Sequence, residues 1–465
     1  MLVFVVAIAA ALAIGGLSAS KPHIAVGLVV AAAAAVLVAL NMRMLPPLLV
    51  VTVFAEGVSV GGFHVGRVVG LLALAAVAYF LLAGGRADLR ANLLILCAGA
   101  LGFLILLSFY WAPSLQFAVK WFFEWALSLA FAVAFAVLVR TERHLRAVLI
   151  AFVWAAAVFG VVGLLTFLAS GGVSRGTGLT GDPNQFATYE ALALPVALAL
   201  AARERVPHRR LPFYGVILVV ILAIVASYSR GGVVTLGVLI VGTLFAPRYV
   251  FFRNRAQKGT YLLILLASAW LVALVGSTAY VHRLGTLLTG SDRGSGRTDL
   301  WAAAWNGYSH HQYAGLGAGG FEARSLDLLH ATPGVNIAAS YVQAGRPVHN
   351  AYLEMLVDLG PAGLILFLAL VGLALFYLLR SGRRFRARGD IERARIAITL
   401  GVALLGLSAS MIFLSIELGH MLWAFAGLAL ALDRASAPDA LEATAPVRRT
   451  RRRRLLGSTH PPLRA

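Results

Sequence analysis

Stretches of about 20 residues with almost no charged side chain recur along the whole chain, and they constrain its fold more than any other feature. A helix of that length crosses a hydrocarbon core of about 30 Å. Only 12% of the residues are charged and 60% are apolar, whereas soluble domains contain roughly 25% charged residues. The sequence therefore predicts an all-α, polytopic transmembrane helix bundle of about 12 to 14 spans. The expected spans lie at about 1–18, 22–40, 45–61, 66–84, 91–110, 117–139, 146–169, 184–202, 211–228, 232–246, 259–280, 351–379, 396–415 and 420–433.

Most of the 39 lysines and arginines fall on one side of the membrane if the loops alternate from an N-terminus inside the cell. Cytoplasmic loops carry such an excess, so the distribution predicts the orientation. The tail, 435–465, should be cytoplasmic and disordered, with its arginine run lying on anionic lipid headgroups. Because the net charge of +20 sits in short loops and in this tail, we expect membrane lipids as partners and no nucleic acid. The first apolar stretch lacks a basic n-region, which favours a retained span over a cleaved signal peptide.

One connection, residues 281–350, is polar, rich in glycine and longer than the other loops, and it falls on the non-cytoplasmic side. Long loops in compact domains are usually functional or disordered. The aromatic side chains of this loop favour packing against the helix ends over disorder. We therefore expect N-terminal transmembrane helices over 1–170 and a region that carries the functional site over 171–434, including this loop.

Two arginines lie where the apolar pattern needs no cation. Arg230 stands between two spans in Ser229-Arg230-Gly231, and a charged side chain near hydrocarbon is a functional candidate by default. Arg297 begins a segment whose Trp301, Trp305 and Tyr308 spacing predicts an amphipathic helix. The planar fork of arginine suits phosphate, and two arginines can match a diphosphate. The structural alternatives are an interfacial arginine that snorkels to headgroups for Arg230 and a solvated arginine at a helix start for Arg297.

His349 begins the span that follows the long loop, at the outer membrane interface. Histidine is the commonest general base, although a lone interfacial histidine is more often structural. Asn350, Glu354 and Asp358 follow at a spacing of four and share one helix face. Carboxylates at that depth need polar partners, which predicts that this face lines a cavity.

A third candidate segment, Asp182-Pro183-Asn184-Gln185, precedes an apolar helix. Asp182 fits the N-cap and Gln185 the N3 position of a capping box. Capping explains the pattern, and the same location would also let Asp182 or Asn184 touch a ligand. The pair His310-His311 lacks a metal-binding pattern, and the single cysteine, Cys97, lies in an apolar run, so we expect neither a metal nor a cofactor.

Taken in order, these motifs resemble the O-antigen ligase and polymerase family of bacterial membrane glycosyltransferases. The resemblance covers about 180–363. Its carriers are Asp182-Pro183-Asn184, Ser229-Arg230-Gly231, Arg297 with Trp301, Gly315-Leu316-Gly317 with Gly320-Phe321, and His349-Asn350 leading to Leu353-Glu354 and Asp358-Leu359-Gly360.

The resemblance implies a multi-pass protein of the inner membrane that makes cell-envelope polysaccharide, such as lipopolysaccharide, at the periplasmic face. It implies metal-independent, inverting transfer of a glycan from undecaprenyl diphosphate to a hydroxyl of lipid A core or of a growing polysaccharide. His349 would be the base, and Arg230 and Arg297 would bind the diphosphate. It leaves open a ligase, a polymerase or a protein-glycosylating relative, although the absence of a large soluble domain after the last span weakens the third option. Two alternatives from other functional classes are a transporter of lipid-linked glycans and a structural membrane protein.

Overall fold

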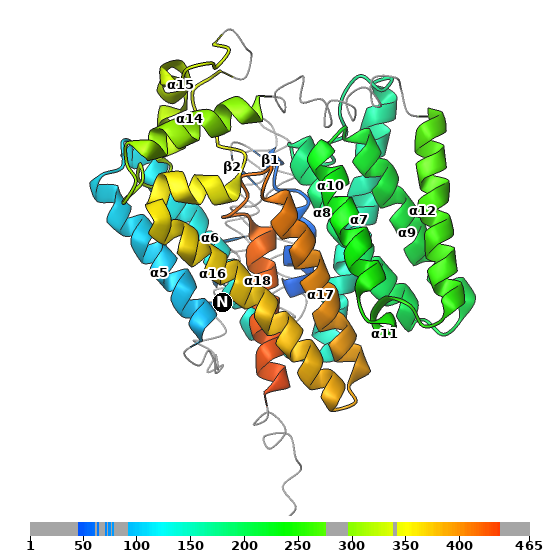
Figure 1. The fold of residues 1–465 in the computed structure, drawn as a ribbon. Coiled ribbons are helices and arrows are strands. Elements are labelled where there is room, and N and C mark those ends of the chain that lie inside the picture. The colour runs from blue at the N-terminus through cyan, green and yellow to red at the C-terminus, as the bar shows by residue number, and fades with distance from the viewer. Residues whose placement is uncertain are drawn as a thin grey trace, which may run out of the picture.

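The computed structural model describes residues 45–60, 63–64, 70–71, 73–75, 77–78, 92–275, 296–337 and 342–437 (Figure 1). This part is helical except for one antiparallel pair of two-residue strands, which confirms the all-α class. The expected spans 1–18 and 22–40, most of 66–84 and the basic tail lie outside the described residues. The elements are α3 (Leu45–Val53), β1 (Ser59–Val60), β2 (Phe63–His64), α5 (Leu93–Leu107), η2 (Ser108–Tyr110), α6 (Leu115–Leu138), α7 (Glu142–Ala169), α8 (Pro183–Arg203), η3 (Pro207–Arg210), α9 (Leu211–Ala226), α10 (Arg230–Phe245), α11 (Arg248–Phe251), α12 (Arg255–Val275), α14 (Arg297–Ser309), α15 (Gly320–Ala331), α16 (Ala351–Ala387), α17 (Ile391–Ser410) and α18 (His420–Ser436).

Within the described residues, six helical segments are long and apolar enough to cross a membrane. Several side chains on their outer surfaces are large, apolar and exposed, such as Phe103, Leu165 and Leu168. Lipid rather than water suits such a surface. The chain is thus a multi-pass membrane protein. The six segments are Leu93–Tyr110, Leu115–Leu138, Glu142–Ala169, Pro183–Arg203, Pro207–Ala226 and Ala351–Ala387.

The expected span at 45–61 is wrong as a continuous helix, because α3 ends at Val53. The chain then turns, and the Gly57 N–H donates to the Leu179 carbonyl at 3.1 Å. A Cβ at Gly57 would lie 2.2 Å from the backbone of Thr180. This close approach requires glycine, and it binds the turn to the segment before α8.

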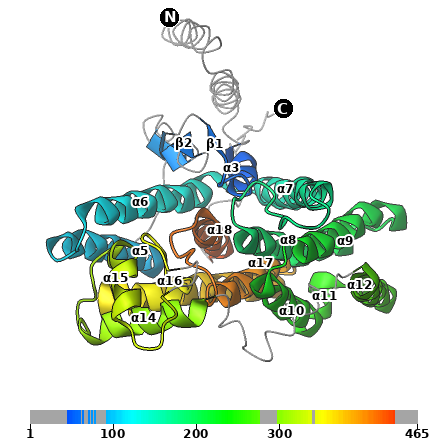
Figure 2. The same cartoon turned by 90° about the horizontal axis from the view of Figure 1, so that it is seen from above.

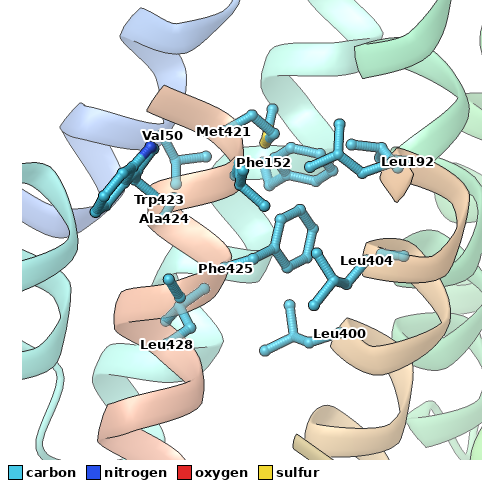
Figure 3. Packing of buried hydrophobic residues seen from close by; sticks show 14 of the residues in the cluster. Val50, Phe152, Leu192, Leu400, Leu404, Met421, Trp423, Ala424, Phe425 and Leu428 are labelled. Atoms are coloured by element: carbon cyan, nitrogen blue, oxygen red, sulfur yellow. The ribbon is translucent and has the colours of Figure 1, made fainter. Parts of the chain in front are cut away.

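Two helices form the centre of the bundle. Almost every side chain of α8 is buried, and α7, α9, α10 and α17 pack around it. Helix α18 lies between α6 and α16 (Figure 2). Figure 3 shows how Phe425 of α18 lies beside Leu400 and Leu404 of α17, in the contiguous core that joins the two centres.

A separate layer, α14 and α15, covers one end of the bundle beside the start of α16 (Figure 1). It has a small core of its own, which includes Leu300, Phe321 and Val357. The connection between the two helices runs along α16 where that helix bends at Gly360, whose φ of 68° is left-handed. There the Leu316 N–H donates to the Val357 carbonyl at 2.8 Å. The expected helix at Arg297 is confirmed, but its buried face combines Leu300 with the small residues Ala303, Ala304 and Gly307, and Trp305 is 58% exposed.

Candidate functional site

His349 lies two residues before the start of α16, and its backbone is held in an uncommon conformation. Its φ of 57° is left-handed, which side chains with a Cβ rarely adopt. The next residue, Asn350, caps the helix by accepting bonds from the N–H groups of Tyr352 and Leu353 at 3.1 Å each. On the other side, the His349 N–H donates to the Ser415 hydroxyl at 2.9 Å. These contacts fix the direction in which the imidazole leaves the backbone.

The charge of His349 depends on burial and on charged neighbours. Burial lowers its pKa, the positive charge of Arg297 lowers it further, and Arg346 adds to the effect, while Asp182 acts in the opposite direction. The result is a pKa of about 4. The imidazole is therefore neutral near pH 7 and can accept a proton. The residues at the N-terminal ends of α8, α14 and α16 thus influence one another electrostatically.

Arg230 is the first residue of α10 and is buried, with 6% of its surface exposed. The turn before it contains Tyr228, whose φ of 50° is left-handed. The Ser229 hydroxyl caps α10 by accepting a bond from the Gly232 N–H at 3.0 Å. That hydroxyl also donates to Asn184 Oδ1 at 3.0 Å. The start of α10 is therefore attached to the start of α8.

A further arginine supports the same turn. Arg175 donates from Nη2 to Asn184 Oδ1 at 3.1 Å and from Nε to the Ser227 carbonyl at 2.8 Å. Asn184, a predicted site residue, thus joins Arg175 to Ser229, the residue before Arg230. The sequence analysis missed Arg175, and its place in a glycine-rich segment just before the Asp-Pro-Asn motif was the available signal.

Arg297 reaches the same region through Phe413. Its guanidinium carbon lies 6.0 Å from the centre of the Phe413 ring, a cation–π distance. The Trp301 ring stacks on Phe413 with 6.5 Å between centroids. A Cβ at Gly231 would lie 3.5 Å from the Cβ of Phe413. Phe413 therefore lies between the start of α14 and the start of α10, which brings the segments of Arg297 and Arg230 together.

Asp182 caps α8, as the sequence predicts. Its Oδ1 accepts bonds from the N–H groups of Asn184 and Gln185 at 2.7 and 2.8 Å. The Gln185 side chain, however, donates to Glu56 at 2.8 Å instead of completing a capping box. Glu56 in turn pairs with His420, with 2.8 Å between Oε1 and Nδ1. Sequence reasoning missed this half-buried pair, because its members lie far apart along the chain.

The two carboxylates of α16 have protein partners. Glu354 and Asp358 are both almost fully buried. Glu354 accepts a short hydrogen bond from the Ser415 hydroxyl, and Asp358 Oδ1 accepts one from the Phe321 N–H at 2.7 Å. The face that we expected to line a cavity is therefore covered by α15 and by the segment before α18. Both residues support the site from outside, through Ser415 and through the α14–α15 layer.

Over the described ranges, no group of three or more histidine, cysteine or acidic side chains is placed to hold an ion. His310 Nδ1 lies 2.9 Å from the Asn306 carbonyl, and His311 Nδ1 lies 3.2 Å from the Gly307 carbonyl. Both rings thus meet the backbone of their own helix.

The segment Met411–Gly419, which we call the α17–α18 loop, was also missed. We expected a span at 396–415, but α17 ends at Ser410, so Phe413 and Ser415 lie in a loop. The polar residues Glu417 and His420, just before a weak apolar stretch, were the signal that the helix ends early.

Comparisons with known proteins agree with the motif reading. Residues 214–368 match the family model described as O-antigen ligase. No curated protein matches the chain. The matched region contains Arg230, Arg297 and His349 but neither Asp182 nor the α17–α18 loop. Over this region, about a third of its length, the chain is similar to the O-antigen ligase family.

Proposed function

We propose that this protein transfers a glycan from undecaprenyl diphosphate to an acceptor hydroxyl, with inversion and without a metal, at the periplasmic face of the inner membrane. The donor is a lipid-diphosphate-linked glycan. The acceptor is lipid A core for a ligase or a growing lipid-linked polysaccharide for a polymerase of the same family. On this proposal, residues 171–434 form the catalytic region, and the basic tail lies in the cytoplasm.

The observation that carries the proposal is the convergence of two arginines and a neutral histidine at helix starts. Arg230 and Arg297 are the first residues of α10 and α14, and His349 precedes α16. Phe413 contacts the first two of these segments, and Ser415 holds the third. Helix N-termini carry a partial positive charge, which adds to the attraction of the guanidinium groups for a diphosphate.

The arrangement supports a single displacement at the anomeric carbon. His349 takes the proton from the acceptor hydroxyl as its oxygen forms a bond to that carbon. The bond from carbon to the diphosphate oxygen breaks on the opposite face, and the electron pair leaves with the diphosphate. Arg230 and Arg297 offset the charge that develops there, which a divalent cation does in other transferases.

The lowered pKa of His349 fits a base that the donor switches on. Without donor, burial and the Arg297 charge keep the pKa at about 4, so the imidazole is a weak base. A diphosphate beside Arg297 would bring negative charge close to the ring and raise this pKa. The histidine would then be a stronger base when there is a donor to attack.

The test is an in vitro transfer assay with a lipid-diphosphate oligosaccharide and candidate acceptors. His349→Ala should reduce kcat by roughly 100-fold or more, because general base catalysis contributes about that much. His310→Ala is the matched control, since within the described part of the chain that ring bonds only to Asn306 and Ser309 of α14. Undiminished transfer by His349→Ala would refute the mechanism, because it would show that His349 is not the base.

The arginines need a separate comparison. Arg230→Lys and Arg297→Lys keep the charge but lose the fork that makes two parallel hydrogen bonds. Both should impair transfer in the assay and in cells that depend on this protein. Full activity in a lysine variant would show that the arginine at that position does not bind the diphosphate through its fork, and it would favour a structural role.

The choice of acceptor separates the remaining readings. Transfer to lipid A core identifies a ligase, and extension of a lipid-linked chain identifies a polymerase. Movement of the lipid-linked glycan across a vesicle membrane, with no transfer to any acceptor, would replace the proposal with a transporter.

A further inference from the structure

The α17–α18 loop contacts His349 and Arg297 and lies beside the start of α10, although it is outside the region that matches the family model. We infer that this loop is the positioning element of the site: Ser415 sets His349, and Phe413 sets Arg297 against the start of α10. The inference rests on the proposed function, because it assigns no reaction of its own. It adds two positioning residues that neither touch the reacting atoms nor occur in the motifs.

The first step concerns His349. A histidine with left-handed φ is strained and persists only where its surroundings fix it. The Ser415 hydroxyl accepts from the His349 N–H and donates to Glu354, so its own orientation is set. Two residues on, the Ala351 N–H donates to the Met411 and Leu414 carbonyls at 2.9 and 3.0 Å. The loop therefore binds two backbone N–H groups, those of His349 and Ala351, at the point where the proposed base leaves the chain.

The second step concerns Arg297. Its side chain lies against the Phe413 ring, and Trp301 and Gly231 also lie next to Phe413. A Cβ at Gly231 would be in ordinary van der Waals contact with Phe413, so the Phe413 side chain lies directly beside the start of α10. One aromatic ring thus sets the separation between the segments that carry the two arginines.

The third step is that the loop is itself anchored. Trp423 Nε1 donates to the Glu417 carbonyl at 3.2 Å, and the Ser128 hydroxyl donates to the Leu418 carbonyl. These bonds attach the far end of the loop to α18 and α6. Because the loop is fixed at that end, it can hold both His349 and Arg297 in place relative to the bundle.

The test distinguishes the role of Ser415 from that of Phe413 by their separate effects on kcat and KM. Ser415→Ala should lower kcat about tenfold with little change in the KM for donor, because the base is misplaced while the diphosphate is still bound. Phe413→Leu should mainly raise the donor KM, about tenfold, because the Arg297 guanidinium loses its platform. Ser415→Thr and Phe413→Tyr should restore both values, since the hydroxyl and the ring return.

Ser410→Ala is the matched control for the serine. Ser410 is buried nearby, and its hydroxyl bonds only to the Leu407 carbonyl of its own helix. A second readout is the acid limb, the pH at which kcat/KM falls on the acid side. Ser415→Ala should raise this pH, because the freed imidazole becomes more exposed to water and its pKa rises. Ser410→Ala should leave it unchanged. Phe413→Leu keeps apolar volume, so it provides a folded variant if Ser415→Ala is unstable.

The outcomes are distinct. If His349→Ala is inactive while Ser415→Ala and Phe413→Leu match the control in kcat, KM and acid limb, the positioning role is wrong and the proposed function stands. If His349→Ala retains activity, the proposed function itself fails. Ser415→Ala and Phe413→Leu could also lose activity to the same extent, without recovery in Ser415→Thr and Phe413→Tyr. That result would overturn the inference, because it would show a general packing defect.

Discussion

Lowering the pH should abolish transfer only near pH 4, because the proposed base must be neutral to accept a proton. An ordinary histidine has a pKa of about 6.5, and burial followed by the Arg297 charge lowers that of His349 to about 4. At pH 5.5, about 97% of His349 would then be neutral, against about 9% of an unperturbed histidine. The two cases differ about tenfold in kcat/KM at that pH.

Initial rates at low donor concentration, followed from about pH 3.5 to 8, give the kcat/KM profile of the free enzyme. Histidine NMR signals assigned by comparison with His349→Gln measure the same pKa directly. The lowered pKa also means that the unfolded chain binds this proton first. The free energy of unfolding should therefore fall as the pH drops from about 6.5 to 4, so fluorescence must show that the protein is still folded. An acid limb centred near 6.5 would refute the reasoning.

Three further predictions concern the supports of the site. Asp182→Asn should keep the cap of α8 while Asp182→Ala lowers the free energy of unfolding by about 1 kcal/mol. The Asn variant should also move the acid limb lower, because the carboxylate opposes the Arg297 charge at His349. Gly360→Ala should cost about 1 to 3 kcal/mol in thermal unfolding, since its Cβ would lie 2.4 Å from the carbonyl oxygen of the facing loop, whereas Gly372→Ala meets nothing within 4 Å. Lys120→Met should remove the 2.9 Å ion pair to Glu322, costing at most about 1 kcal/mol because it is partly exposed. It should also speed hydrogen exchange across α15.

The helical class and most helix positions could be predicted because lipid imposes a simple pattern. A chain that must satisfy its backbone inside hydrocarbon forms long apolar helices, and these stand out in a sequence. The segment at 45–61 was predicted wrongly because apolarity alone does not reveal a turn. There, Gly57 breaks the helix for a tertiary contact with Thr180 that hydropathy cannot register.

The candidate side chains were predictable because they are charged or polar where a membrane pattern needs none. The residues that hold these side chains in place could not be predicted in the same way. Phe413 and Ser415 are ordinary residues at the end of an apolar run, and only the early end of α17 at Ser410 places them in a loop. Asp358 was predicted as a supporting residue of a cavity, but it bonds to the Phe321 N–H because the α14–α15 layer folds back over α16.

The region matched by the family model and the structural unit of the site are therefore different. The match, 214–368, holds the three proposed functional side chains. The groups that fix them come from both flanks: Asn184 binds Ser229 from one side, and Ser415 binds His349 from the other. A fragment limited to the matched region would contain the chemistry without its geometry, since a displacement of about 1 Å can cost roughly 100-fold in rate. On the proposed function, the helices outside the match hold the segments of Arg230, Arg297 and His349 in place, which is the reason that these short motifs need a much longer chain around them.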